Sequence, residues 1–221
     1  ASLIDAFAHA KTFGSLIQIP EALDNGLVTL ADGLGKAMQS GDVFAQAAAQ
    51  DLWPLVGQAT ILAMKFDAVV ANPPYMGSKG MNVVVKEFAR SEFPDSKSDL
   101  FSMFIERGFD WCRESGFNSM VTMQSWMFLS SYEVIRGKLL DDRFLVSLIH
   151  LPYDGRGPTA MGINFGISVF VFQKNISIGA QGVFDCFRYF ELTEDGLPQQ
   201  FPSGNERNVL AKQQDFQKIS G

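Results

Sequence analysis

The apolar positions of this chain follow two spacings, one typical of helices and one of strands, and the spacing changes from segment to segment. Over residues 3 to 12, apolar side chains recur at helical spacing. Ser2 and Asp5 have the pattern of a capping box at the start of that helix. The short apolar run at 14 to 18 predicts a strand, so the chain is expected to begin with a helix and a strand.

A long segment from 21 to 64 is rich in Ala, Leu and Gln, with apolar residues at helical spacing. Gly41 and Pro54 are expected to break it, because glycine weakens a helix and proline lacks the N–H that a helix interior needs. We therefore predict a helical insertion between 21 and 64, made of two helices.

From residue 66 onward, short apolar runs alternate with amphipathic segments. Residues 66 to 71 have the pattern of a buried parallel strand that ends at a proline pair. A polar stretch follows at 77 to 98, and residues 99 to 112 then place apolar side chains on one face of a helix capped by Ser98. The remaining predicted elements are strands at 118 to 123, 144 to 150, 165 to 173 and 183 to 190, and a helix at 132 to 140.

Strands that alternate with helices predict an α/β fold, with a mostly parallel sheet covered on both faces and ligands bound at the carboxyl ends of its strands. A chain of 221 residues is long enough for one such domain. We assign it to residues 1 to 190 and expect the Gln- and Gly-rich remainder, 191 to 221, to be loosely held.

The sequence Asn72-Pro73-Pro74-Tyr75 directly follows the strand at 66 to 71. Neither proline has an N–H and both fix φ, so this loop is stiff and offers acceptors without competing donors. The Asn72 side-chain oxygen and the Pro73 carbonyl can together accept both N–H groups of an exocyclic amino group, which frees the nitrogen lone pair to attack a sulfonium methyl. Tyr75 can stack on a base that has left its helix. A plain turn is the alternative, which the preceding apolar strand disfavours.

The string FDAVVANPPYMGSKG, followed by KSDLF at 97 to 101, resembles the amino-methyltransferases of DNA restriction and defence systems. It is most similar to the large adenine-specific enzymes of BREX phage-defence systems, the PglX type. TFGSLI at 12 to 17 and LIHLPYDGRGPTAMGINFGISVFVFQK also look like that family, so the resemblance extends from about residue 7 to 174. It implies a Rossmann-like sheet that uses S-adenosyl-L-methionine to methylate adenine N6 in DNA.

The resemblance also implies roles for single residues. Asn72, Pro73 and Tyr75 would grip the amino group, Pro74 would stiffen the loop, and Asn72 would border the cofactor as well. Asp99 in KSDLF would steady the loop, although its place in the first turn of a helix equally suits interaction with the helix dipole.

Two further contacts follow from the same resemblance. Ser15 and Leu16 stand where the family has an acidic residue and an apolar one beside the cofactor adenine, so Ser15 replaces the acid. A second aromatic side chain would sandwich the flipped base, and Tyr153 is the first candidate and Phe165 the second. Counted without the family pattern, both aromatic residues suit the core.

The strand and glycine turn by which the family binds the methionine and ribose parts of the cofactor have no counterpart before TFGSLI. The glycines of Asp32-Gly33-Leu34-Gly35 come after it, lack a strand-turn-helix context, and are interpreted as helix breaks or starts. We therefore expect the main cofactor loop to lie upstream, the domain that reads DNA sequence to be missing, and this chain alone to be inactive.

A net charge of −6 excludes a complete DNA clamp, which neutralises many phosphates with basic residues. Four basic residues follow the proline loop: Lys79, Lys86, Arg90 and Lys97. They can meet phosphates beside a flipped base, or form an ordinary solvated loop together with the acidic residues between them. Partners are expected to be DNA, through the missing domain, and other defence proteins.

The two cysteines, Cys112 and Cys186, lack zinc-site spacing, so we expect no metal and a buried thiol at each. With neither a bilayer-length apolar run nor a signal peptide, the protein is expected to be cytoplasmic, without a membrane partner. Two other functions remain open. One is methylation of another amino group, such as cytosine N4, RNA guanine N2 or a protein glutamine, and the other is a non-catalytic scaffold in a defence complex.

Overall fold

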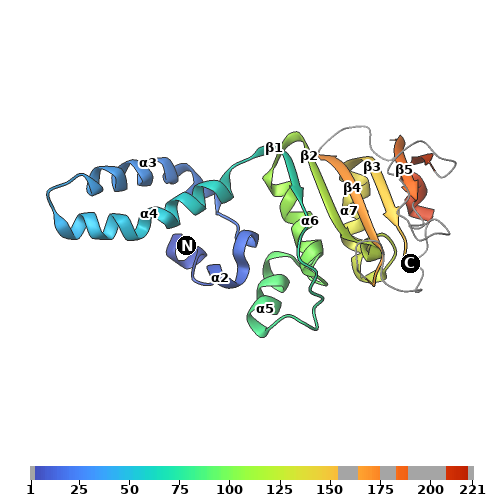
Figure 1. The fold of residues 1–221 in the computed structure, drawn as a ribbon, viewed down its shortest axis with the longest axis horizontal. Helices are drawn as coiled ribbons and strands as arrows, with labels where there is room; N and C mark the ends of the chain where they lie inside the picture. The colour runs from blue at the N-terminus through green and yellow to red at the C-terminus, as the bar shows by residue number, and fades with distance from the viewer. Residues whose placement is uncertain (1–2, 154–163, 175–182, 189–207, 219–221) are drawn as a thin grey trace, which may run out of the picture. The chain divides into compact units, whose positions relative to one another are not determined.

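The computed structural model describes residues 3 to 153, 164 to 174, 183 to 188 and 208 to 218 (Figure 1). Contacts divide the chain into two compact units, Ala1–Lys65 and Phe66–Gly221. Tyr153 and Phe165, the predicted aromatic partners of the base, both lie within the described ranges.

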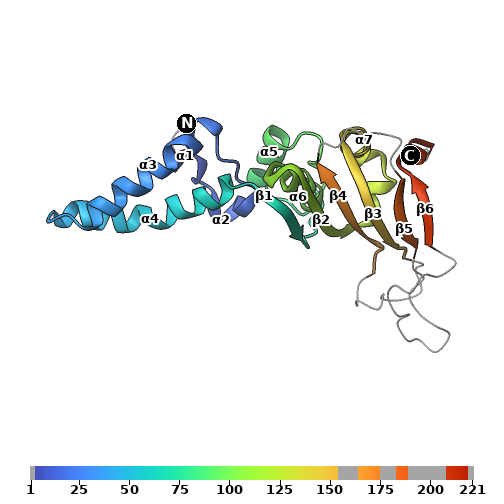
Figure 2. The same ribbon diagram turned by 90° about the horizontal axis from the view of Figure 1, so that it is seen from above.

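The first unit is helical. Its elements are α1 (Leu3–Ala6), α2 (Ala10–Phe13), the 3-10 helix η1 (Gly14–Leu16), α3 (Glu21–Met38) and α4 (Val43–Ala63). Helices α3 and α4 form an antiparallel hairpin (Figures 1 and 2), with Leu34, Ala49 and Val56 buried between them. None of the described helices has the length and hydropathy needed to cross a bilayer.

The break near Gly41 is confirmed, because α4 begins just after it with Asp42 as N-cap, whose Oδ1 accepts from the Phe44 amide at 2.9 Å. Pro54 does not break the helix and lies inside α4. Ala49 and Val56, on either side of it, are both buried, so packing outweighs the cost of about 3 kcal/mol for an interior proline. The expectation of breaks at the glycines of 32 to 35 is wrong, since α3 runs through them.

The strand predicted at 14 to 18 is also wrong. Gly14 has a φ of +54°, in the left-handed region that glycine tolerates, and this ends α2 and starts the tight 3-10 turn η1. Leu16 and Ile17 are buried by that turn instead of by a neighbouring strand. The predicted helix at 3 to 12 is likewise two short helices, of which α1 contains no buried residue.

The second unit is a six-stranded sheet with helices. Its elements are β1 (Phe66–Ala71), α5 (Val83–Glu92), α6 (Leu100–Trp111), β2 (Cys112–Met123), η2 (Gln124–Met127), η3 (Ser130–Tyr132), α7 (Glu133–Asp142), β3 (Arg143–Leu151), β4 (Ile167–Lys174), β5 (Val183–Arg188), β6 (Asn208–Lys212) and η5 (Gln213–Lys218). The order across the sheet is β1-β2-β4-β3-β5-β6.

This sheet is mixed, which corrects the prediction of a mostly parallel one. The pairs β1–β2 and β3–β5 are parallel, whereas β4 runs antiparallel to β2 and β3, and β6 antiparallel to β5. A parallel return from β3 to β4 needs a crossover, usually a helix, and the sequence between those strands has no helical pattern. The antiparallel direction of β4 relative to β3 could therefore have been predicted from the sequence.

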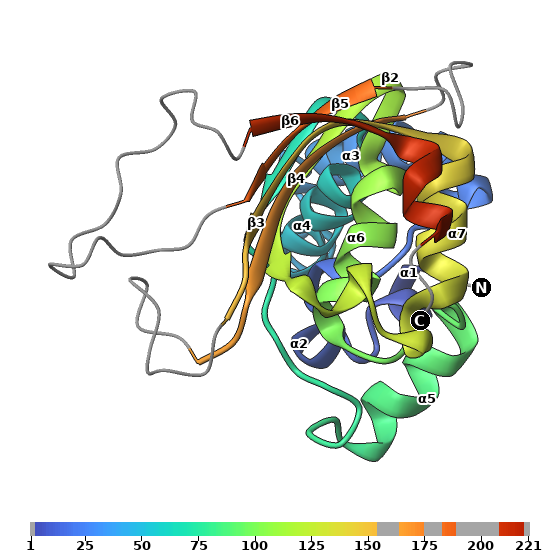
Figure 3. The same ribbon diagram turned by 90° about the vertical axis from the view of Figure 1, so that its right-hand side faces the viewer.

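Within this unit, α6 and α7 pack on one face of the sheet (Figure 3), and a core of aromatic and aliphatic side chains fills the space between. Two expectations, that β1 is buried and that the sheet is covered on both faces, are wrong for β1, because residues on its opposite face are exposed. Val70 is 79% exposed and Phe117, on the same face of β2, is 40% exposed. Val69 and Ala71 point to the core side and contact it.

Close packing of α6 on β2 depends on Gly108. A Cβ there would lie 2.6 Å from Met120 Cε and 2.7 Å from the carboxamide of Asn118. The buried Asn118 in turn donates from Nδ2 to the Ile105 carbonyl at 3.0 Å, which fixes the helix against the strand. This contact sets the position of β2, the neighbour of β1.

Several elements of the described residues were not predicted, among them α5, β6 and η5. Helix α5 occupies part of the stretch taken as a polar loop, with Asn82 as its N-cap and Ala89 buried. In the segment from 191 to 221, β6 and η5 are formed, and Gln213 is fully buried. Its Oε1 accepts from the Leu145 amide at 2.9 Å, so this part is held to β3 rather than loosely attached. Cys112 is a buried free thiol, as expected; the Cys186 side chain lies outside the described residues.

Candidate active site at the carboxyl end of β1

The loop Asn72-Pro73-Pro74-Tyr75, called the NPPY loop below, begins where β1 ends. Pro73 is buried, Asn72 and Pro74 are exposed, and Tyr75 is half-buried. The buried proline anchors the loop, and the exposed asparagine is left accessible at the carboxyl edge of the strand. Asn72 can therefore meet a ligand without a change in the core.

The Tyr75 hydroxyl holds the Asn72 side chain. It lies 3.1 Å from Asn72 Oδ1 and 3.2 Å from the backbone carbonyl oxygen of Val121 in β2. A phenol has one hydrogen to donate, so the two acceptors share it. Asn72 Oδ1 has a second lone pair, which remains available to another donor. The loop thus presents an acceptor whose orientation is set from β2.

The Tyr75 ring packs among aromatic side chains. It makes an edge-to-face contact with Phe165 at a centroid distance of 5.3 Å and another with Phe101 at 6.1 Å. Burial, and secondly the charge of Asp99, raises the pKa of Tyr75 above its ordinary value of 10.0. The hydroxyl therefore keeps its proton, and remains a donor to Asn72, throughout the neutral range.

Asp99 joins the NPPY loop to the start of α6. Its Oδ1 accepts from the Met76 amide at 2.9 Å and from the Phe101 amide at 3.2 Å. The Leu100 amide also donates to the Met76 carbonyl at 3.1 Å. Asp99, not Ser98, is the N-cap, which corrects the predicted cap. Both roles considered for Asp99 in the sequence, at the helix start and at the loop, are therefore present.

The carboxyl group of Asp99 is only 6% exposed. Burial raises its pKa above the ordinary 3.8, while the hydrogen bonds from backbone amides oppose that rise. The amide contacts are what make a buried carboxylate acceptable at this position. Loop and helix are consequently linked by a carboxyl group whose backbone hydrogen bonds offset part of the cost of its burial.

Of the two aromatic candidates for the base sandwich, the structure brings Phe165 to the loop. Phe165 lies just before β4, and because β4 is antiparallel to β2, its start is at the same edge as the end of β1. Tyr153, the first choice, follows β3, which is one strand further from β1 in the sheet order. Tyr153 is half-buried there.

The sequence reading missed three residues that hold the start of β4. The Gln124 amide donates to the Gly166 carbonyl at 2.9 Å, and His150 Nε2 lies 2.7 Å from Gln124 Oε1. A Cβ at Gly166 would be 2.3 Å from the Gln124 carboxamide, so any other residue there would force the Gln124 side chain to move. The signal available in the sequence was that glycine directly after Phe165. These residues fix the aromatic partner of Tyr75.

Ser15 and Leu16 belong to the first unit. Leu16 is buried, with 3% exposure, and contributes to the packing of the turn. Ser15 is exposed and lines a cavity of about 240 Å³ together with Phe7, Ala10, Gly14, Ile17, Gln58, Ile61 and Leu62. Apolar walls suit a flat ring such as the adenine of S-adenosylmethionine. The described residues that line this cavity carry no charged side chain, so they do not suit the charged methionine end of the cofactor.

Comparison with known proteins bears on this geometry. A family model described as Eco57I restriction-modification methylase matches residues 11 to 156. The adenine-specific methyltransferase BrxX of Escherichia coli O9:H4 (strain HS) is 43% identical over 224 residues, which cover 97% of this chain and 18% of that protein. The adenine-specific methyltransferase PglX of Lacticaseibacillus casei (strain Zhang) is 28% identical over 236 residues, covering 100% of this chain and 19% of that protein.

The chain thus spans about a fifth of the length of these curated relatives. Among solved structures, one described as the structural basis of complex assembly and conformational transition of a type I restriction-modification system aligns over 99% of this chain and 61% of that chain, with a TM-score of 0.52 and 12% identity. A likeness at that identity concerns the fold, which is α/β with a Rossmann-like methyltransferase sheet.

Proposed function

Because this chain belongs to the Eco57I restriction-modification methylase family, we propose that it supplies the amino-group site of a DNA adenine N6 methyltransferase. One observation carries the proposal. Asn72, Tyr75 and Phe165 meet at the edge where β1 ends, with the Asn72 oxygen held in place and exposed. The names of the relatives support adenine as the base.

The chemistry follows from the acceptors. When bound, S-adenosylmethionine supplies an electrophilic methyl on its sulfonium sulfur. Asn72 Oδ1 and the Pro73 carbonyl accept the two N6 hydrogens of an extruded adenine, which draws the nitrogen toward tetrahedral geometry and localises its lone pair. That lone pair would accept the methyl group, and the electrons of the broken carbon–sulfur bond would remain on the sulfur of the cofactor. The nitrogen then loses one proton to solvent.

The aromatic residues hold the base. Extrusion costs a few kcal/mol of lost stacking, which contact with an aromatic ring partly offsets. Tyr75 stacks on the adenine in this proposal, and Phe165, whose ring meets that of Tyr75 edge to face, supports the Tyr75 ring from the start of β4. Tyr153 borders the base from the neighbouring strand end. Pro74 has no N–H to compete for the acceptors.

The proposed cofactor contacts are assigned in each unit by itself: in the second unit Asn72 borders the methyl group, and in the first unit the cavity lined by Ser15 suits an adenine ring. We assign the ribose and methionine groups to residues other than those of the cavity, because its lining has no charged side chain. Leu16 acts through the shape of the turn that forms the cavity. DNA and the other proteins of a defence system are the proposed partners.

The test uses the intact protein, S-adenosylmethionine and unmodified DNA, with mass spectrometry of the digested nucleosides. N6-methyladenine is the expected product, and methylation restricted to cytosine N4 would contradict the proposal. Asn72→Ala should lower the rate by about 10² to 10³-fold, the usual cost of removing one polar group aimed at the reacting atoms. Asn25→Ala, an exposed change on α3, is the matched control and should retain activity.

Asn72→Ala should leave the fold intact, because the side chain is exposed and the Tyr75 hydroxyl retains the Val121 carbonyl as its acceptor. Circular dichroism and the melting temperature check this. Tyr75→Ala should weaken binding of the extruded base by about 1 to 3 kcal/mol, the worth of one base-aromatic stack. Asn72→Ala protein that methylates at the wild-type rate would refute the mechanism.

A further inference from the structure

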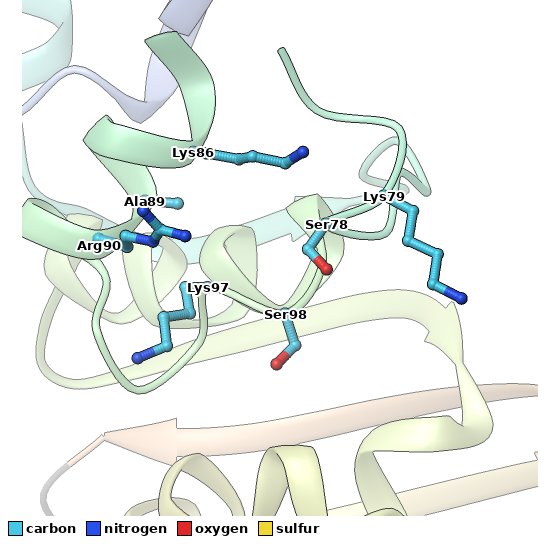
Figure 4. A pocket seen from close by; sticks show the side chains of 7 residues that line it. All are labelled: Ser78, Lys79, Lys86, Ala89, Arg90, Lys97 and Ser98. Atoms are coloured by element: carbon cyan, nitrogen blue, oxygen red, sulfur yellow. The ribbon is translucent and has the colours of Figure 1, made fainter. Parts of the chain in front are cut away.

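A basic cavity lies next to the NPPY loop. Its volume is about 390 Å³. The residues that line it come from α5, from the loop after Tyr75 and from the segment before α6: Ser78, Lys79, Lys86, Ala89, Arg90, Lys97 and Ser98. Figure 4 shows Lys86 and Arg90 reaching from α5, with Lys79 on the loop across from them and Lys97 below. The four basic residues that follow the proline loop in the sequence therefore share one cavity.

Among the described residues, those that line this cavity include no carboxylate. Lys86 and Arg90 are one helical turn apart and share a face of α5, whereas Glu87 and Glu92 fall off that face. Asp95, the nearest acidic residue in sequence before Lys97, pairs with Lys138 instead. Cations gathered without a counter-charge repel one another, so an anion in the cavity would be favoured.

Asp99 is the acidic residue that follows Lys97 and Ser98, and its carboxylate already accepts hydrogen bonds from backbone amides. It is buried and receives the Met76 and Phe101 amides. The Ser98 hydroxyl donates to the Ser131 carbonyl at 3.3 Å, so it is left as an acceptor, while the Ser78 hydroxyl can donate. Arg90 adds a fork of donors suited to two oxygens of one phosphate. The donor set matches a phosphate.

The cavity is tied to the catalytic loop. The Ser78 amide donates to the Ser98 carbonyl at 3.0 Å, two residues after Met76 is bound by Asp99. Lys79 is four positions after Tyr75, so their Cα atoms are at most about 14 Å apart. One strand of a duplex carries a phosphate every 3.4 Å along the axis, so this reach corresponds to about four nucleotides.

We propose that this cavity binds one backbone phosphate of the target strand, within about four nucleotides of the extruded base. The inference rests on the proposed function for the position of the base. It does not rest on it for the contact with DNA, because phosphate binding is independent of sequence and of methyl transfer. The cavity then fixes the register of the strand while the NPPY loop receives the base.

The first test measures binding of the intact protein to a fluorescent duplex of arbitrary sequence over a range of salt concentrations. Lys86→Gln with Arg90→Gln should lower the slope of log K against log salt by about 0.9, the value for one phosphate contact. At ~0.1 M salt this corresponds to an affinity about eightfold weaker. Lys36→Gln with Lys212→Gln removes the same charge from α3 and β6 and should leave the slope unchanged.

Lys86→Arg keeps the cation and should retain the wild-type slope, which separates loss of charge from loss of fold. If the Lys86 and Arg90 double variant has the slope of the control double variant, the proposal is overturned. The same holds if Lys86→Arg weakens binding as much as the double variant does.

The second test replaces single phosphates of the target strand by uncharged methylphosphonates, in a duplex that carries the methylated sequence. Wild-type protein should lose affinity at one position within about four nucleotides of the modified adenine. The double variant should show no further loss at that position, and an undiminished loss there would overturn the proposal.

These readouts separate the two hypotheses. Should Asn72→Ala retain methylation while the salt slope falls as expected, the methylation mechanism fails and the phosphate site stands. Should Asn72→Ala abolish methylation while the slope is unaffected by Lys86 and Arg90, only the phosphate site fails.

Discussion

Replacement of Asp99 tests how the catalytic loop is positioned. Asp99→Ala removes the acceptor of the Met76 and Phe101 amides, and with it the link between the NPPY loop and α6. Asp99→Asn is the matched change, because a carboxamide keeps one oxygen in the place of Oδ1 and loses only the charge.

The cost of Asp99→Ala follows from its two contacts. Loss of an N-cap costs about 1 kcal/mol. The second bond is worth about 1 kcal/mol, since Met76 is 41% exposed and its amide can turn to water. A destabilisation of about 2 kcal/mol results. If this whole amount is needed to bring the loop back into its active position, the methylation rate falls about 30-fold. Asp99→Asn should cost less than half of that free energy.

Urea unfolding of this chain gives the stability, and the turnover number of the intact protein gives the effect on the loop. The direction in which stability changes with pH is a further test. Burial raises the pKa of Asp99, so its contribution to stability is greatest below the ordinary value of 3.8 and is lost as the pH rises through the raised pKa. Asp99→Asn should remove that dependence. Equal losses for the Ala and Asn variants would show that charge, and not the amide contacts, positions the loop.

Three further changes test other parts of the structure. Gly108→Ala should destabilise the fold by about 1 to 3 kcal/mol through overpacking. Gly137→Ala, where a Cβ meets nothing within 4 Å, should instead stabilise it by up to about 1 kcal/mol. Thermal unfolding of both variants checks this pair, and equal shifts in melting temperature would refute the packing argument. Burial raises the pKa of Glu106 above 4.5, so the contribution of Glu106 to stability declines as the pH rises through the raised pKa. Glu106→Gln should therefore make the free energy of unfolding depend less on pH. An unchanged pH dependence would exclude Glu106 as its cause. Tyr75→Phe keeps the ring but frees the Asn72 side chain, so kcat should fall while KM for DNA stays near the wild-type value; a rise in KM alone would show that the hydroxyl serves binding instead.

The part of the site that the sequence predicted is local. An apolar strand followed by two prolines and flanked by Asn72 and Tyr75 specifies a stiff loop at a strand end, because prolines fix the backbone without help from distant residues. The elements that were assigned correctly, including β1 and α6, have strong periodicity over their whole length.

The parts that were missed depend on distant contacts. Helix α5 starts with Val83, Val84 and Val85, whose branched side chains disfavour helices, and it forms because Asn82 caps it and Ala89 is buried. The choice of Tyr153 before Phe165 assumed that catalytic side chains follow strands. At the edge where the parallel strands β1 and β2 end, an antiparallel strand begins, so the residue just before that strand lies there. Only the pairing of β4 with β2 reveals that β4 is antiparallel.

The pairing of Leu151 with Ile167 has a consequence for how such enzymes can diversify. Since these residues pair at the edge of the sheet where β1 ends, the chain departs from that edge after Leu151 and returns to it at Ile167. Any length of connecting sequence can be accommodated between two such neighbouring points without disturbing the register of the sheet. We therefore expect that a change in the length of this connection leaves β1 and the position of Asn72 unchanged.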